Sequence, residues 1–389
     1  MAETGRRVQS PHPRLILLEP ELLLAVRRRL FDGDPELMAA DERLFQEARQ
    51  ALESAPASVL DKVRPGAGGE MRDYASIHPM WWPAADASNG LPYVRRIDEV
   101  NPEVRDWDQV RLNGTCSAIH TLCLAYFFSD LEEFAAYAAM LVRTWFLDQS
   151  MGMHPHLAYA AAVPGRCDGD HRGITEGVPL LWVLDGAGLL EESRSWSREE
   201  EQGLHQWFAA YLDWLRSSPQ GRKQALEPDH NGTWYDVQVA AVGLYLGDER
   251  LCRQVVEEFG RRRIEEQIEA DGRLVHEESQ GGGLDLCVSN LTGLFDLADL
   301  GVRVGVDLWS YEPTGGASLR SAFERLVESA LEPAATDGLQ YHTLLPLVRR
   351  GAIRFADPSA EQRLHRVGDV EASDRTNLLY PATTAEHLV

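Results

Sequence analysis

The ten residues from Asp229 to Gln238, DHNGTWYDVQ, bring together carboxylates, an imidazole, a carboxamide, hydroxyl groups and an indole. Pro228 precedes them, and an apolar helical pattern begins at Val237. Backbone N–H groups point out of the first turn of a helix, and imidazole exchanges protons near neutral pH. The stretch therefore predicts a binding or catalytic site at a loop-to-helix junction. The alternative is a purely structural helix start, with Asp229 or Thr233 as the N-cap.

Two irregular stretches carry most of the other side chains that could do chemistry. The first, residues 71–111, is rich in aromatic and turn-forming residues and contains Trp81-Trp82 and Arg95-Arg96. The second, residues 151–173, contains His154-Pro155-His156, Tyr159 and Asp170-His171-Arg172. Long irregular loops with exposed aromatic residues more often bind ligands or close over a site than fill space. The alternative is that the tryptophans only cover the edge of the core.

Some of these residues could instead bind a metal ion. His154, His156 and His230 would supply three nitrogen ligands, the number that a catalytic zinc ion takes. The sequence has no His-Glu-x-x-His pattern, however, and a His-Pro-His run can point its rings apart. The five cysteines form no Cys-x-x-Cys pair, which argues against a cysteine zinc site and a disulfide framework. We therefore predict no metal and no other cofactor.

Helical periodicity dominates the elements that must position these residues. It predicts helices over 15–30, 40–52, 107–128, 131–146, 177–190, 197–217, 233–246, 249–270, 288–301, 318–331 and 341–348. Strand signals are nearly absent. Paired helices with polar loops between them predict an all-α toroid or solenoid. We expect one domain over 1–389, with a loose lead at 1–14 and a polar, partly ordered tail from about 355.

The net charge of −23 argues against nucleic acid and anionic membranes as general partners and favours a small-molecule substrate. Lys62 and Lys223 are the only lysines, a bias typical of a GC-rich bacterial genome. In the first thirty residues the apolar runs, 15–18 and 22–26, are at most five residues long, too short for a signal peptide or a membrane span. We therefore expect a cytoplasmic protein, and the sequence leaves its oligomeric state open.

Several segments between about 70 and 312 together resemble the alginate lyase family, in the family's order. They are Trp81-Trp82-Pro83, Gly90-Leu91-Pro92-Tyr93 with Arg95-Arg96, Arg143 with Trp145-Phe146-Leu147-Asp148, Leu157 with Tyr159-Ala160, Arg172-Gly173-Ile174, Trp207-Phe208, Gly232-Thr233-Trp234-Tyr235-Asp236 and Gly305-Val306-Asp307-Leu308-Trp309. The resemblance implies an incomplete (α/α) toroid with a long, deep cleft. It implies substrate contacts from Tyr74, His78, Trp82, Arg95, Arg96, Arg172, Trp234, Tyr235 and Gln280.

The catalytic positions depart from the family pattern. The family has Asn-Asn-His before Gly-Thr-Trp-Tyr, whereas this chain has Asp229-His230-Asn231. Aligning on Asn290-Leu291 places Gln280 at the family's Arg and Leu286 at its Tyr. The family's Asn-Pro-Asn-Leu-Asn-Tyr reads His154-Pro155-His156-Leu157-Ala158-Tyr159 here.

These departures bear on the β-elimination that the resemblance implies. That reaction needs a group that neutralises the carboxylate, a base, and a donor for the departing oxygen. Leu286 donates no proton, and Gln280 does not balance a carboxylate as a guanidinium does. Elimination run backward is conjugate addition. The sequence thus favours a repurposed enzyme that dehydrates a secondary metabolite, such as a polyketide intermediate, and adds a nucleophile, with ring closure when both groups share one molecule.

In this hypothesis His230 is the base, and Asn231 and Gln280 bind the carbonyl oxygen. His154, His156 or Tyr159 is the acid. Two alternatives stay open. One is a polyuronate lyase that acts by β-elimination through a rearranged His230-Asn231 pair. The other is a sugar- or metabolite-binding protein without catalysis.

Overall fold

The computed structural model describes residues 13–97, 99–279, 283–331, 341–357, 359–364 and 371–382. The α-helices are α1 Pro20–Phe31, α2 Pro35–Glu53, α3 Asp108–Ser129, α4 Glu132–Val142, α5 Leu180–Leu190, α6 Arg198–Ser217, α7 Pro219–Gln224, α8 His230–Tyr245, α9 Glu249–Phe259, α10 Glu265–Gln267, α11 Val275–Ser279, α12 Gly283–Arg303, α13 Leu319–Ala330, α14 Tyr341–Phe355, α15 Ser359–Leu364 and α16 Thr376–Leu379. Short helical turns are η1 Val59–Asp61, η2 Pro102–Asp106, η3 Arg143–Leu147, η4 His171–Gly177 and η5 Gly260–Ile264. The strands are β1 Ala75–Ile77, β2 Trp81–Trp82, β3 Val94–Arg95 and β4 Tyr159–Ala162.

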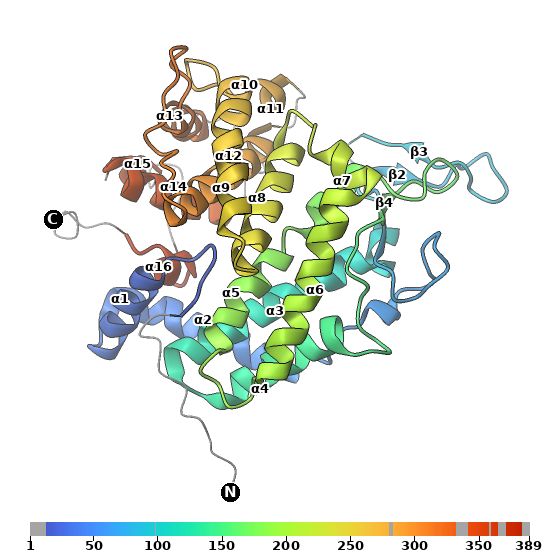
Figure 1. Ribbon diagram of the computed structural model, residues 1–389, viewed down its shortest axis with the longest axis horizontal. Helices are drawn as coiled ribbons and strands as arrows, with labels where there is room; N and C mark the ends of the chain where they lie inside the picture. The colour runs from blue at the N-terminus through green and yellow to red at the C-terminus, as the bar shows by residue number, and fades with distance from the viewer. Residues whose placement is uncertain are drawn as a thin grey trace, which may run out of the picture.

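Helices that follow one another in the chain pack as neighbours, which gives the toroid (Figure 1). Helix α3 packs against α4 and α5, and α8 packs against α9 and α12. Every residue from Asn231 to Gly243 is buried, so α8 is enclosed on all sides. Helix α2, by contrast, buries one stripe at Leu37, Ala40, Leu44 and Ala48 and lies on the outside. The predicted all-α toroid is confirmed.

Local sequence explains where the key helices begin. Ser197 and Glu200 form a capping box at the start of α6. Asp229 is the N-cap of α8 and accepts a hydrogen bond from the Asn231 N–H. One of the two caps considered for this junction is therefore the observed one, and His230 lies in the first turn of α8.

The few strands join the two irregular stretches. Strand β1 pairs in parallel with β4, with Ala75 opposite Tyr159, and β2 pairs with β3 as a small antiparallel ribbon. Figure 1 shows this ribbon projecting from the side of the molecule opposite α13 and α15. The β1–β4 pair brings residues 71–83 beside residues 151–173, although helices α3 and α4 separate them in sequence.

The structure adds short elements that the sequence did not predict. Helices α7 and α11 were not predicted, because each is too short to show an apolar period. Within the described part of the tail, Leu378 is fully buried and Arg349 donates to Asn377 Oδ1 at 2.7 Å. Residues 1–12 of the predicted lead and Gln280 lie outside the described residues.

The stretch from His171 to Leu190 is long and apolar enough to cross a membrane, with a mean hydropathy of 1.2 over its best window. Of that window 72% is buried inside the protein, as in a core helix. Its composition therefore reflects its place in the toroid.

Candidate active site

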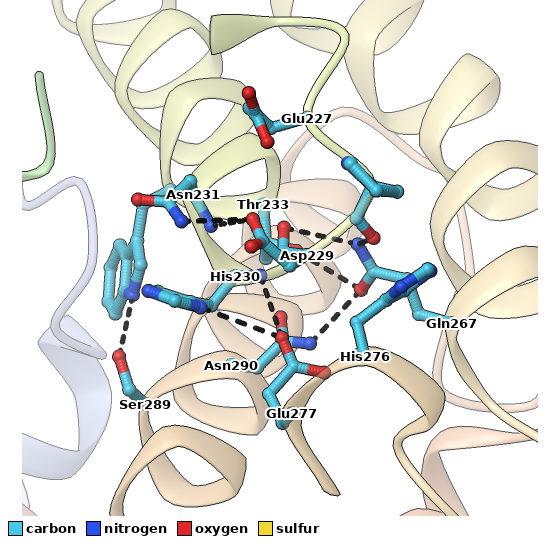
Figure 2. A network of polar contacts seen from close by, with 12 residues as sticks. Glu227, Asp229, His230, Asn231, Thr233, Gln267, His276, Glu277, Ser289 and Asn290 are labelled. Atoms are coloured by element: carbon cyan, nitrogen blue, oxygen red, sulfur yellow. Dashed lines mark hydrogen bonds and ion pairs between the residues drawn. The ribbon is translucent and has the colours of Figure 1, made fainter. Parts of the chain in front are cut away.

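A network of buried polar side chains fixes the first turn of α8 (Figure 2). Asp229 Oδ1 accepts hydrogen bonds from the backbone N–H and the side-chain amide of Asn231, both at 3.0 Å. Gln267 Oε1 accepts from Thr233 Oγ1 and from Asn290 Nδ2, each at 3.2 Å. The network ties α8 to α10 and α12, so the side chains of this turn are held in place.

His230 projects from this turn and lies beside Glu277 of α11 (Figure 2). The Glu277 side chain is fully buried, and its Oε1 accepts the His230 backbone N–H at 2.8 Å. His230 Nδ1 is 3.6 Å from the same oxygen, and 17% of the His230 side chain is exposed. Figure 2 shows one ring nitrogen turned toward the carboxylate and the other directed away from it. A half-buried imidazole backed by a carboxylate has the arrangement of a general base.

Two buried atoms of this pair have no hydrogen-bond partner within the part of the chain that the structure describes. They are His230 Nδ1 and Glu277 Oε2. Catalytic hydrogen bonds are often long in a ligand-free structure and shorten when substrate binds. A small turn of the His230 ring would bring Nδ1 within hydrogen-bond distance of Glu277.

A second cluster lies where β1 and β4 meet. His154 Nδ1 is 2.7 Å from Asp73 Oδ1, and His156 Nε2 is 3.2 Å from the same oxygen. The Tyr159 ring packs edge-on against His156, with centroids 6.0 Å apart. Burial lowers the pKa of His156, and the charge of Asp73 opposes this effect. Three of the five predicted catalytic residues therefore meet at one point.

A third group contains residues that the resemblance placed in the cleft. Burial lowers the pKa of His78; Asp170 opposes this, and the charges of Arg95 and Arg172 lower it further. Each of these three charged side chains therefore lies close enough to His78 to affect its pKa. Arg172 keeps 61% of its side chain exposed, and its Nη2 is 3.5 Å from Glu227 Oε2. The guanidinium is thus open to an anionic ligand.

The turn η4 connects these groups. It packs against β4 on one side and against α7 and α8 on the other. Within it, His171 Nε2 lies 2.6 Å from Glu227 Oε1, and His171 Nδ1 lies 3.1 Å from Asp170 Oδ1. Glu227 stands just before the Asp229 cap. The chain from the β1–β4 pair to the start of α8 is therefore continuous in space.

Two predicted substrate-binding residues are corrected. Tyr74 is completely buried, and its hydroxyl donates to Glu176 Oε2 at 2.6 Å. A ring without exposed surface offers no contact to a substrate. Tyr235 is 8% exposed, and its hydroxyl donates to the Leu215 carbonyl at 3.3 Å. This bond joins α8 to α6 and leaves little of the ring for a substrate.

Other predicted contacts have partners of their own. The Arg96 guanidinium stacks over Trp82 at 4.5 Å and pairs with Glu99 at 3.2 Å. The Trp234 indole donates to Ser289 Oγ at 3.1 Å. The Arg96 guanidinium thus covers one face of Trp82, and Trp234, which is 9% exposed, offers little more surface than Tyr235.

The five predicted catalytic residues fall into two groups. His230 and Asn231 stand at the start of α8, and His154, His156 and Tyr159 stand at β4. Within the described ranges no hydrogen bond or ion pair joins the two groups directly. The carboxylates Asp73, Glu227 and Glu277 were missed, as was His171. Asp73 and His171 lie within the two irregular stretches, but nothing in the sequence indicated which imidazole each carboxylate would meet.

A helical toroid with a polar site at the start of a central helix is the architecture of the (α/α) toroid class of alginate lyases, whose solved structures this chain resembles. The chain belongs to the alginate lyase family, because that family's model matches residues 58–336 of its 389. No curated protein sequence matches it.

Solved structures agree with this membership. The chain is similar to an alginate lyase from Bacteroides ovatus, with 28% identity and a TM-score of 0.89 over 95% of this chain and 99% of that one. Alginate lyase A1-III from Sphingomonas species A1 has 14% identity and a TM-score of 0.59 over 96% and 99%. A variant of A1-III complexed with tetrasaccharide has the same values and shares the fold.

Family membership supports the lyase part of the sequence-based hypothesis. It does not extend to dehydration, addition or ring closure on a polyketide intermediate. Of the hypotheses drawn from the sequence, the polyuronate lyase fits the family match and the structural similarity better than the secondary-metabolite enzyme does.

Proposed function

We propose that this protein is a polyuronate lyase that cleaves its substrate by β-elimination. Its family membership and its likeness to the Bacteroides ovatus alginate lyase over nearly the whole of both chains support the reaction class. The observation that carries the proposal is the His230 imidazole backed by the buried Glu277 in the first turn of α8.

In the proposed reaction His230 removes the proton from the carbon that bears the carboxylate. The electron pair left behind forms the double bond to the neighbouring carbon, and the glycosidic oxygen leaves with the electrons of its bond. The imidazole becomes an imidazolium, and the negative charge of Glu277 stabilises it from behind. A carboxylate plays the same part behind the histidine of hydrolase triads.

The substrate carboxylate must be neutralised before its neighbouring proton becomes acidic. Arg172 is the candidate, because it is exposed and only loosely held by Glu227. A guanidinium can bind a carboxylate through two parallel hydrogen bonds. Arg172 would thus supply the positive charge that the sequence lacks at Gln280. The N-terminal end of the α8 dipole, where Asn231 lies, also favours a nearby anion.

The departing oxygen needs a proton, and Tyr159 is our candidate donor. Its phenol lies beside His156 and close to Gly68: a Cβ atom on Gly68 would be 2.5 Å from the Tyr159 hydroxyl oxygen. Gly68 therefore packs directly against the phenol and restricts where the hydroxyl can lie. Tyr159→Phe would remove the phenolic proton and keep the aromatic ring.

The test is an assay of purified protein on alginate, on glucuronan and on a neutral glucan, followed by the absorbance of the unsaturated uronate. We expect product from a polyuronate and none from the glucan. His230→Ala should lower kcat by about 10²-fold or more, the usual contribution of a general base. His205→Ala, which removes an exposed histidine from α6, is the matched control and should keep full activity.

Folded protein that yields no unsaturated product from either polyuronate would overturn the proposal. Binding of uronate oligosaccharides without turnover would then indicate the non-catalytic alternative. Undiminished turnover in His230→Ala would remove this residue from the role of base while leaving the lyase class intact.

A further inference from the structure

We propose that Asp73, His154 and His156 form a binding site for a divalent first-row transition metal of the zinc type, with one coordination position left open. The inference concerns metal binding alone and does not depend on the polyuronate reaction. It revises the expectation, drawn from sequence, of a chain without a metal.

The donor atoms converge. One ligand atom from each of the three residues can be chosen so that all lie within 4.8 Å of one another. Asp73 Oδ1 is 3.2 Å from His156 Nε2 and 2.7 Å from His154 Nδ1. Zinc bonds of about 2.0–2.1 Å in a tetrahedron keep ligand atoms roughly 3.3 Å apart. Small rotations of the two rings therefore suffice to admit an ion.

The backbone around the three residues is tied together. The His154 N–H donates to the Arg72 carbonyl at 3.0 Å, and the Arg72 guanidinium donates to the Gly152 carbonyl at 2.7 Å. The Met153 carbonyl accepts from the Trp207 indole at 2.8 Å. These bonds place residue 73 against residue 154 without help from the histidine rings. A site whose ligands are held in advance loses little conformational entropy on binding.

The choice of donors indicates the kind of ion. Two imidazoles and one carboxylate suit zinc, iron, nickel and copper, whereas magnesium and calcium take oxygen ligands. Three protein ligands leave a position for water or for an oxygen of a ligand. Glu70 Oε2 is 4.0 Å from His154 Nδ1, and its side chain is 67% exposed, so it too can reach this position.

The departure from the family pattern points the same way. Where the family carries two asparagines, this chain has His154 and His156, and both rings reach the same carboxylate oxygen. Asparagine in place of either histidine would keep a polar side chain but remove the imidazole ligand. His230, the third histidine weighed from sequence, lies instead beside Glu277.

Metal binding competes with a purely hydrogen-bonded arrangement. In the ion's absence both histidines can donate to Asp73, and the Ala158 N–H approaches His156 Nδ1 at 3.4 Å. A His156 that ligates through Nε2 carries its proton on Nδ1, so this long contact must be given up. The experiment therefore has to distinguish a metal site from a hydrogen-bonded relay, in which both histidines only donate to Asp73.

Tag-free protein is stripped with a chelator, loaded with Zn²⁺, dialysed and assayed for bound metal by mass spectrometry. We expect about one equivalent in the wild type and at least a tenfold loss of affinity in His154→Asn/His156→Asn, which restores the family's residues. His205→Ala serves as the control and should bind like the wild type. Loading with Co²⁺ gives a second readout, because a four-coordinate His₂–carboxylate site has strong visible absorption that the double variant should lack.

Wild-type protein that retains no metal and shows no such Co²⁺ spectrum overturns the proposal and leaves the hydrogen-bonded relay. Equal retention by the wild type and the folded double variant also overturns it. Both measurements are made without polysaccharide, so a failed lyase assay does not affect them.

Discussion

His230 differs from an ordinary surface histidine in the carboxylate behind its ring. Glu277→Gln keeps the size of that side chain and the acceptor for the His230 N–H, but it removes the negative charge. We expect kcat on a polyuronate to fall at least about tenfold, but less than in His230→Ala, with little change in KM. Glu278→Gln, one residue further and paired with Arg325, is the control. An unchanged kcat would mean that Glu277 only caps the backbone.

Arg172 is the second residue whose role can be separated by kinetics. Arg172→Lys keeps the charge and loses the paired hydrogen bonds that a guanidinium makes with a carboxylate. We expect kcat/KM to fall about tenfold, which corresponds to about 1.4 kcal/mol. Arg198→Lys at the exposed start of α6 should have no effect. Equal kinetics in both variants would show that another group meets the substrate carboxylate.

At this scale the sequence could identify the imidazoles but not their partners. His230, His154 and His156 stand out by residue type within polar loops. Glu277 lies 47 residues beyond His230, and Asp73 lies 81 residues before His154. The packing of the helices determines these pairs, so the spacing of residues along the sequence does not indicate them. Tyr74 was misplaced for the same reason, since only the packed fold shows its ring to be buried.

At the scale of elements, a buried ion pair holds the segment before β1 to α3. Lys62 Nζ lies 2.9 Å from Asp108 Oδ2, both side chains are fully buried, and the ammonium also donates to the Val59 and Met71 carbonyls. Lys62→Met leaves Asp108 buried without its partner and should lower the free energy of unfolding by about 3–5 kcal/mol. Urea unfolding measures this change.

The control for that experiment is the chain's other lysine. Lys223 is exposed on α7, and Lys223→Met should change the free energy of unfolding by less than about 0.5 kcal/mol. A similar small loss in Lys62→Met would show that Asp108 is neutral in the folded protein. Burial does raise the pKa of Asp108 to about 6, against the opposing charge of Lys62.

The link between β1 and η4 predicts a pH dependence. Glu176 on η4 accepts hydrogen bonds from Tyr74 and Ser76, and burial raises its pKa to about 7. The folded protein therefore binds this proton more tightly than the unfolded chain does. The contribution to stability is full below about pH 4.5, the usual value for Glu, and is lost as the pH rises through 7.

Glu176→Gln is neutral at every pH and should lack this loss. The Tm of the variant minus that of the wild type should therefore increase between pH 5 and pH 8. Thermal unfolding at a series of pH values measures it. A difference in Tm that stays constant across that range would contradict the raised pKa.

The long helices could be predicted from the sequence, since α3, α6, α8 and α12 each span several turns. Elements that complete the site could not. Helix α11 has five residues, and the β1–β4 pair uses three and four. Elements of this length show no reliable period, and they form because tertiary packing holds them.

At the scale of the whole molecule, the charge of −23 opposes the approach of a polyanion. Salt screens this repulsion, because the Debye length falls from about 30 Å at 0.01 M to about 8 Å at 0.15 M. We expect kcat/KM on a polyuronate to rise over that interval. A steady fall would show that the arginines near the site control association. A short uronate oligosaccharide, with fewer charges, should respond less.

The toroid and its family could be predicted from motifs spread between about 70 and 312, because many weak matches in the right order reinforce one another. The reaction could not be read from the altered motifs alone. Substitutions at Leu286 and Gln280 suggested different chemistry, whereas the family match and the Bacteroides ovatus structure favour the family's own reaction class.

The parallel pairing of β1 with β4 also sets the order in which the site can be built. A ribosome synthesises the chain from its N-terminus. Asp73 can therefore contact His154 only after residue 154 has been made, and His230 can contact Glu277 only after α11 has been made. A nascent chain that stops before α11 holds most of the central helices but lacks the carboxylate behind the base. Two separately expressed fragments, divided between α9 and α11, would therefore be inactive alone, and their recombination would report the closing of the toroid.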